Sequence, residues 1–331
     1  MIERVEYDEF GLFHENAAEY GIVDDGPPTV RREFVEMGDG RRLSALVWGT
    51  DEPELVFVHG GAQNAHTWDT VALALGRSMI AVDLPGHGHS DGPGDHPEGQ
   101  LSAPGNARDV ATVIEALAPR AKCVIGMSLG GMTSIALAGQ RPDLVRALVL
   151  VDITPGVNAH KSRAISNFVN GPKTFPSFAE ILARTIEHNP TRTEASLRRG
   201  ILHNALQLED GSWVWRYRRF DAPNPLDAPP PPAATAGPTD GADRLETAYS
   251  PLWDIIAGYE GPLMLVRGML PQSVVDDADE DQLRELQPSA RIERVEQAGH
   301  SVQGDTPIEL AALIDAFVLG DAGGNGGGDA E

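Results

Sequence analysis

Ser128 has the sequence surroundings that most clearly indicate chemistry. It is the central residue of GMSLG at 126–130, a G-x-S-x-G pattern, with an apolar stretch at 123–125 before it and residues 133–140, which can form a helix, after it. A sharp turn between a strand and a helix strains the backbone of its central residue, so the flanking positions must lack side chains that would collide. Ser128 is therefore a candidate nucleophile. The plainer alternative is a glycine-rich turn with an incidental serine.

A serine hydroxyl becomes a useful nucleophile only beside a base and a group of anion-stabilising donors. The sequence HGG at 59–61, Asp152 and His300 each lie at or shortly after the end of a predicted strand. Because catalytic groups of open α/β sheets gather at the carboxyl ends of the parallel strands, we expect these residues to meet Ser128 at one sheet edge.

Taken together, the motifs resemble the α/β-hydrolase family, specifically its cap-bearing members with a serine nucleophile. The resemblance covers about residues 32–320. The motifs that carry it are HGG at 59, DLPGHGHS at 83, GMSLGG at 126, LVLVDITP at 148 and AGHSVQGDTP at 298. The chain order of serine, acid and histidine is the one that this fold requires.

The resemblance implies a role for each of these residues. Ser128 attacks an acyl carbonyl, and His300 takes its proton as general base and later returns it to the leaving group as general acid. The backbone N–H of Leu129 and that of Gly61 or Ala62 form the oxyanion hole.

The acid departs from the usual family pattern. Most members carry it in a G-x-x-D sequence, but here the position three residues after Gly268 is Pro271. Asp152 is the first candidate, because an acid that orients an imidazole must sit at a fixed strand end. Asp276 and Asp277 are the second candidates, although their acidic run is also typical of a helix N-terminus. Asp152 itself has a structural alternative, as a carboxylate at the start of an insertion.

Other histidines and aromatic residues have less specific interpretations. His59 is assigned a structural role in the oxyanion loop. His87 and His89 form an H-x-H pair without a third ligand at metal-site spacing, so no metal site and no cofactor are predicted. Trp68 and the aromatic residues at 213–220 line a substrate pocket or pack within an insertion.

The apolar runs and helical periodicities predict a doubly wound α/β fold with a mostly parallel sheet. The expected antiparallel hairpin comprises residues 32–37 and 42–48. The other expected strands are 54–58, 78–83, 123–125, 147–151, 263–266 and 291–295. The expected helices are 67–75, 104–118, 178–188, 194–206 and 279–286, with a last amphipathic helix around 310–317.

We expect the α/β-hydrolase core to comprise residues 29–153 and 251–320, with a helical cap inserted at 154–250. Residues 221–240 form a proline-rich loop in this insertion. The acidic extension at 1–28 is expected to lie on the surface or to be loosely ordered, and the glycine-rich tail at 321–331 is expected to be disordered.

Composition limits the partners and the compartment. The 331 residues include 49 acidic and 26 basic side chains, giving a formal net charge of −23, which disfavours binding to nucleic acid or to an anionic membrane. Cys123 is the single cysteine, so a reducing compartment fits. No apolar stretch reaches the roughly 20 residues of a membrane span, and the N-terminus has no signal pattern, so a cytoplasmic protein is predicted.

The sequence thus predicts a cofactor-independent serine hydrolase that cleaves a small carboxylic ester or lactone through an acyl-enzyme. The alternatives are a C–C bond hydrolase, a cofactor-free perhydrolase of the haloperoxidase type, and a non-catalytic protein that binds small molecules. An epoxide hydrolase or dehalogenase of this fold needs an aspartate at position 128 and is discounted. The oligomeric state stays open.

Overall fold

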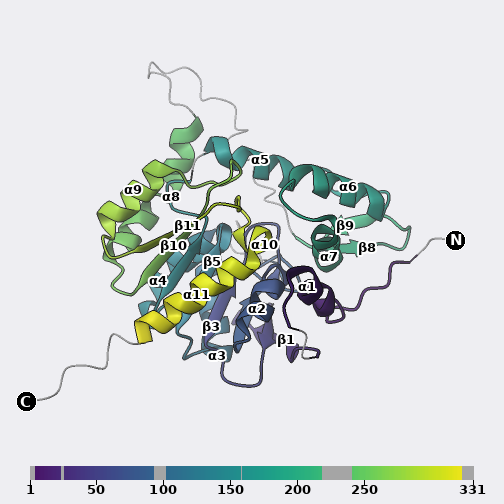
Figure 1. The fold of residues 1–331 in the computed structure, drawn as a ribbon, viewed down its shortest axis with the longest axis horizontal. Coiled ribbons are helices and arrows are strands. Elements are labelled where there is room, and N and C mark those ends of the chain that lie inside the picture. Colours follow the sequence, from purple (N-terminus) through teal and green to yellow (C-terminus); the bar gives the residue numbers. More distant parts are fainter. Residues whose placement is uncertain (1–3, 24–25, 93–101, 158, 218–240, 323–331) are drawn as a thin grey trace, which may run out of the picture.

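The computed structural model describes residues 4–23, 26–92, 102–157, 159–217 and 241–322 (Figure 1). The expected proline-rich loop at 221–240 and most of the expected disordered tail, residues 323–331, lie outside this part of the chain. Within it, no helix combines the length and the apolar character needed to cross a membrane.

An eight-stranded sheet forms the centre of the fold, in the order β1-β2-β4-β3-β5-β6-β10-β11. The hairpin strands β1 and β2 pair antiparallel, as does β2 with β4, and all the other pairs are parallel. This arrangement confirms the predicted fold class. The strands are β1 (Val30–Glu36), β2 (Arg42–Trp48), β3 (Leu55–Val58), β4 (Met79–Val82), β5 (Cys123–Met127), β6 (Leu148–Val151), β10 (Leu263–Gly268) and β11 (Arg291–Val295).

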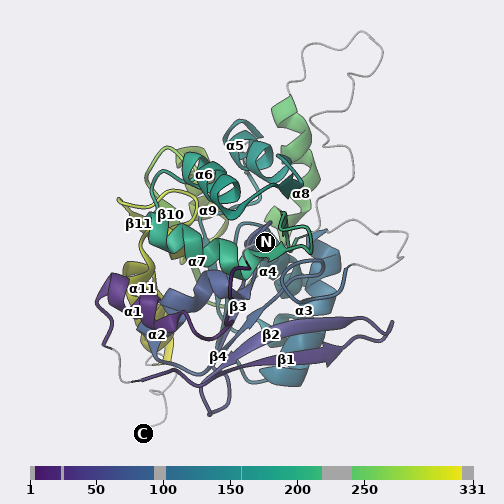
Figure 2. The ribbon, with the colours of Figure 1, turned by 90° about the vertical axis from the view of Figure 1, so that its right-hand side faces the viewer.

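The inner strands are apolar along their whole length because helices cover both faces of the sheet. One buried cluster joins the sheet to α3 (Ala103–Leu117), α4 (Leu129–Gln140), α8 (Gly241–Gly258) and α9 (Asp277–Leu286). A second cluster joins the opposite face to α1 (Phe13–Tyr20), α2 (Asp69–Leu75) and α11 (Pro307–Ala322). Figure 2 shows α2 and α11 on one side of the sheet and α3 on the other. The short helices are η1 (Ala65–Trp68), η2 (Pro142–Leu144) and α10 (Val302–Asp305).

A separate group of elements lies beyond the carboxyl ends of the parallel strands (Figure 1). It contains α5 (Ala159–Val169), α6 (Phe178–His188), α7 (Glu194–Asn204) and a three-stranded sheet in the order β7-β9-β8. These strands are β7 (Thr174–Phe175), β8 (Ala205–Gln207) and β9 (Trp213–Trp215). The small sheet was not predicted. The helix expected at 194–206 ends at Asn204, where the chain turns into β8.

The N-terminal extension was expected to lie on the surface or to be loosely ordered, but residues 4–23 include an ordered helix that is partly buried. Helix α1 packs against α2, and Phe13 is buried with its ring 4.9 Å from that of Trp48. Upstream of the helix, the carboxylate of Glu9 accepts hydrogen bonds from Arg32 and lies 3.1 Å from Nε2 of His66. The acidic composition concealed the apolar pair Phe13 and Ala17, which lie one helical turn apart and are both buried.

Candidate active site

Ser128 lies at the junction of β5 and α4 and has the strained backbone that the sequence predicts. Its φ is 51°, in the left-handed region that side chains disfavour. A Cβ on Gly126 would collide with the backbone of Gly130, and a Cβ on Gly130 would collide with the carbonyl of Val58. Both glycines are therefore required by close approach of the backbone, and the turn holds the Ser128 side chain at the end of the sheet.

Asp152 is fully buried at the end of β6 and also has a positive φ, 46°. Its Oδ2 atom lies 2.9 Å from Nδ1 of His300 and also accepts a hydrogen bond from the backbone N–H of Val274 at 3.0 Å. Its Oδ1 atom accepts from the N–H of Gly268 at 2.9 Å and from the hydroxyl of Ser273 at 2.6 Å. The hydrogen bonds fix the carboxylate and select the His300 tautomer with its proton on Nδ1, so Nε2 is the nitrogen able to accept a proton.

The second pair of acid candidates has other partners. Asp276 caps helix α9 in a reciprocal capping box with Asp279. The carboxylate of Asp277 is largely exposed and pairs with Arg267 at 2.8 Å. The structure thus brings Asp152, rather than this pair, to His300.

The loop at 59–62 is held by two neutral histidines. His59 Nδ1 lies 2.7 Å from the carbonyl oxygen of Gly60, and its Nε2 accepts from the N–H of Leu84 at 3.0 Å. His87 Nε2 accepts from the N–H of Ala62 at 3.2 Å. Burial lowers the pKa of both imidazoles, that of His87 to about 3, so they stay uncharged at neutral pH. The H-x-H pair therefore includes a loop-holding residue.

The two candidate oxyanion donors of this loop differ in their partners. Because the N–H of Ala62 donates to His87, the N–H of Gly61 remains as the candidate donor to the oxyanion. A Cβ on Gly60 would lie 3.2 Å from Cβ of Ser128, so the loop passes close to the serine. Leu129 is the first residue of α4, where backbone N–H groups have no partner within the helix.

Comparison with known proteins identifies the family of the chain. Residues 53–307 match the family model described as the alpha/beta hydrolase fold. The chain belongs to the α/β-hydrolase family. The predicted family and fold are confirmed, as is the prediction that the chain is an enzyme of the hydrolase class.

Two curated relatives of this α/β-hydrolase are an esterase and a lipase. It is 40% identical to esterase Rv0045c of Mycobacterium tuberculosis, over 93% of this chain and 94% of that one. It is 26% identical to the sn-1-specific diacylglycerol lipase ABHD11 of Mus musculus, over 80% of this chain and 81% of that one.

Solved structures agree with the sequence comparison. A structure of esterase Rv0045c, from work on its transition metal inhibition, superposes on the α/β-hydrolase with a TM-score of 0.75. The match covers 96% of this chain and 100% of that one at 40% identity. E-2-(acetamidomethylene)succinate hydrolase superposes with a TM-score of 0.69 at 23% identity, which shows a common fold.

A cavity of about 730 Å³ opens over the candidate residues of this α/β-hydrolase. Gly61, Ser128, Leu129 and His300 line it from the core, and α5, α6 and α7 line it from the other side. Trp215 also lines the cavity. Trp68 instead is fully buried in the core against Phe57 of β3, so it neither lines the cavity nor packs within the insertion.

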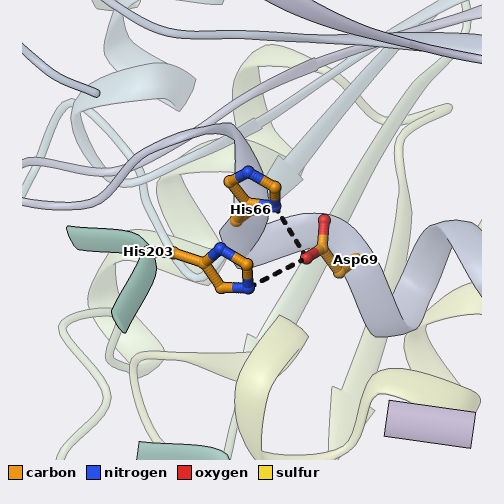
Figure 3. A group of neighbouring side chains, drawn as sticks. All are labelled: His66, Asp69 and His203. Carbon is orange, nitrogen blue, oxygen red and sulfur yellow. Dashed lines mark hydrogen bonds and ion pairs between the residues drawn. The ribbon is translucent and has the colours of Figure 1, made fainter. Parts of the chain in front are cut away.

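Sequence reasoning missed a second cluster on the cavity wall, formed by His66, Asp69 and His203 (Figure 3). Nδ1 of His66 lies 2.9 Å, and Nε2 of His203 3.7 Å, from Oδ2 of Asp69. The two rings stack with centroids 3.8 Å apart. His66 and Asp69 lie one helical turn apart, the only local signal, whereas His203 comes from the distant helix α7.

The two stacked imidazoles differ in charge. Burial alone would lower the pKa of His66, but the carboxylates of Asp69 and Glu9 raise it to about 9. Burial lowers the pKa of His203, and the neighbouring charge on His66 lowers it further. A charged ring therefore stacks on a neutral one.

Proposed function

We propose that this α/β-hydrolase cleaves a small carboxylic ester or lactone through an acyl-enzyme formed on Ser128. The observation that carries the proposal is the hydrogen bond between Asp152 and His300, 2.9 Å long, on a cavity that Ser128 also lines. The esterase named among the relatives favours an ester as the substrate class.

We infer the following reaction from the groups that line the cavity. Nε2 of His300 takes the Ser128 proton as the serine oxygen attacks the substrate carbonyl, and the N–H groups of Leu129 and Gly61 stabilise the oxyanion. The protonated imidazole, whose charge Asp152 stabilises, then gives its proton to the leaving alcohol. His300 then takes a proton from a water molecule that attacks the acyl-enzyme, and it returns this proton to the Ser128 oxygen as the carboxylic acid leaves.

The sequence-based domain boundaries belong to the same proposal. We assign residues 29–153 and 251–320 to the core and 154–250 to a cap that shapes the acyl and alcohol sites. The contribution of α5–α7 to the cavity wall supports this assignment. A cytoplasmic location and the absence of nucleic-acid and membrane partners stay predictions from composition.

The test is hydrolysis of p-nitrophenyl esters, from acetate to long acyl chains, by the wild type and by Ser128→Ala. Ser289→Ala is the control, because Ser289 is exposed. We expect turnover to vanish in the first variant and to persist in the second. Equal turnover in the wild type and in Ser128→Ala would exclude the serine mechanism.

A fluorophosphonate probe separates the proposal from its alternatives when no ester is turned over. Labelling of the wild type, with none in Ser128→Ala or His300→Ala, would indicate an activated serine with a narrow substrate, such as a lactone or a C–C diketone. No labelling would favour the non-catalytic binding protein.

A further inference from the structure

The cluster of His66, Asp69 and His203 offers three ligand atoms of the kinds that transition metals bind. Their ligand atoms all lie within 4.8 Å of one another, and both imidazole edges face the same carboxylate (Figure 3). In a tetrahedral zinc site with bonds of about 2.0–2.1 Å, ligand atoms lie roughly 3.3 Å apart. The observed separations of 2.9 and 3.7 Å from Asp69 Oδ2 bracket that value.

Two of the polar atoms in the cluster lack the partners that buried groups normally have. Among the residues that the structure describes, Oδ1 of Asp69 and Nε2 of His203 are buried without a hydrogen bond. The two residues are only 2% and 5% exposed. An unsatisfied buried polar atom destabilises a fold, so each one calls for an explanation such as an ion. A metal bound to Nε2 of His203 supplies it for that nitrogen, and the same ion balances the charge of the Asp69 carboxylate.

The opposite nitrogens of the two imidazoles already have the partners typical of metal ligands. Nε2 of His66 lies 3.1 Å from the Glu9 carboxylate, and Nδ1 of His203 lies 2.8 Å from the Tyr7 hydroxyl. Histidine ligands usually use the second nitrogen in this way, which orients the ring and sets its tautomer. The nitrogens that remain are the two that face Asp69.

We propose that His66 Nδ1, the Asp69 carboxylate and His203 Nε2 bind one divalent transition-metal ion of the zinc type. Two imidazoles and a carboxylate suit Zn²⁺, Co²⁺ or Ni²⁺, whereas Mg²⁺ and Ca²⁺ prefer oxygen ligands alone. The ion replaces the Nδ1 proton of His66, which passes to solvent, and the rings, which are stacked 11° from parallel, must turn out of the stack before both nitrogens point at it. The cluster lines the cavity, so the ion has a path in and a position left for a water ligand.

The site joins the core to helix α7 beside the oxyanion loop. Asn64 donates to the carbonyl oxygen of His203 at 3.0 Å, and the side chain of Asn204 donates to that of Ala62 at 2.7 Å. An ion bound to His203 therefore also restrains residues 203–204, which hydrogen-bond to Asn64 and Ala62 of the oxyanion loop. Because a preformed ligand set exists only in the folded chain, occupancy raises the melting temperature.

The experiment is a titration of the full-length protein, first stripped with EDTA, with ZnCl₂ by calorimetry and with CoCl₂ by visible absorption. We expect one equivalent at this site, an intense cobalt spectrum of tetrahedral type, and a zinc-dependent rise in melting temperature. His203→Ala and Asp69→Asn should abolish all three. Tyr7→Phe, which removes only the outer hydroxyl, should weaken zinc binding by about tenfold or more.

Matched variants separate this site from other places where zinc could bind. His14→Ala removes an exposed histidine, and His300→Ala removes the histidine of the proposed triad. Both variants should still bind one equivalent of zinc. Loss of binding in either variant, or its retention in folded His203→Ala, would overturn the proposal. So would a wild type that binds no zinc. Because these readouts do not depend on ester turnover, they stand whether or not Ser128 is the nucleophile.

Discussion

Asp152 reaches His300 across the sheet from the end of β6, and its carboxylate accepts hydrogen bonds from three further donors. In the proposed reaction Asp152 carries out, from a neighbouring strand, the orienting task that a G-x-x-D aspartate after β10 performs in most family members. Because the acid comes from the end of β6 and not from the segment after β10, a proline is tolerated at the usual acid position, 271. Gly268 and Val274, on either side of that position, instead donate their backbone N–H groups to Asp152.

Asp152→Asn is expected to lower kcat by about 10⁴, because an amide no longer selects the Nδ1–H tautomer or stabilises the imidazolium. Steady-state ester kinetics measure the effect, and circular dichroism checks the fold. Asp277→Asn is the control, since that side chain is 88% exposed and pairs with Arg267. Similar losses in the two variants would argue against Asp152 as the acid.

His87→Leu tests whether the imidazole holds the oxyanion loop. The variant removes the acceptor of the Ala62 N–H. The loop that carries Gly61 and Ala62 then loses one of the hydrogen bonds that hold it in place. We expect kcat to fall by roughly tenfold, the equivalent of one hydrogen bond of about 1.4 kcal/mol, with little change in KM. His14→Leu, at an exposed position, should leave kcat unchanged. An unaltered kcat in His87→Leu would show that the reaction does not need His87 to hold the oxyanion loop.

Gly130 and Gly200 differ in the space around them, so replacing each by alanine should change the free energy of unfolding in opposite directions. A methyl group on Gly130 would strike the carbonyl of Val58, so Gly130→Ala is expected to destabilise the fold by about 3 kcal/mol or more. A methyl group on Gly200, in helix α7, meets nothing within 4 Å and should stabilise the fold by about 0.5–1 kcal/mol. Urea denaturation measures both changes. A Gly130→Ala variant as stable as the wild type would contradict the close packing of the turn.

The parts of the fold that could be predicted from sequence have strong local patterns. Uninterrupted apolar runs such as that of β5 predict buried parallel strands, and the glycines around Ser128 predict its turn. Strands β7 and β8 have only two or three residues, too few for a period to be visible. The contact between His66 and His203 exists only after folding brings α7 to the core, and no spacing rule foresees it.

The choice between Asp152 and Asp276 shows the same limit at the site. Each aspartate follows a plausible pattern, a strand end in one case and a helix start in the other. Only the three-dimensional structure shows which carboxylate meets His300. The Glu9 and Tyr7 contacts were missed because an acidic terminal segment is typical of a solvated extension.

Glu280 gives a pH dependence of stability whose sign can be worked out. Burial alone would raise the pKa of this carboxyl, but hydrogen bonds from Arg294, Arg284 and Arg267 lower it from 4.5 to about 2. A folded-state pKa below the unfolded one stabilises the protein above pH 4.5, and this stabilisation disappears as the pH falls towards 2. Because two of the arginines are half exposed and screened by solvent, we expect a contribution of about 1–2 kcal/mol.

The measurement compares the free energy of unfolding of the wild type with that of Glu280→Gln at several pH values. The wild type should be more stable at about pH 6, and the difference should shrink towards about pH 3 as the unfolded chain takes up the proton. Glu285→Gln, an exposed position on the same helix, should show no such trend. A difference that stays constant with pH would mean that Glu280 stabilises the helix by packing rather than by its charge.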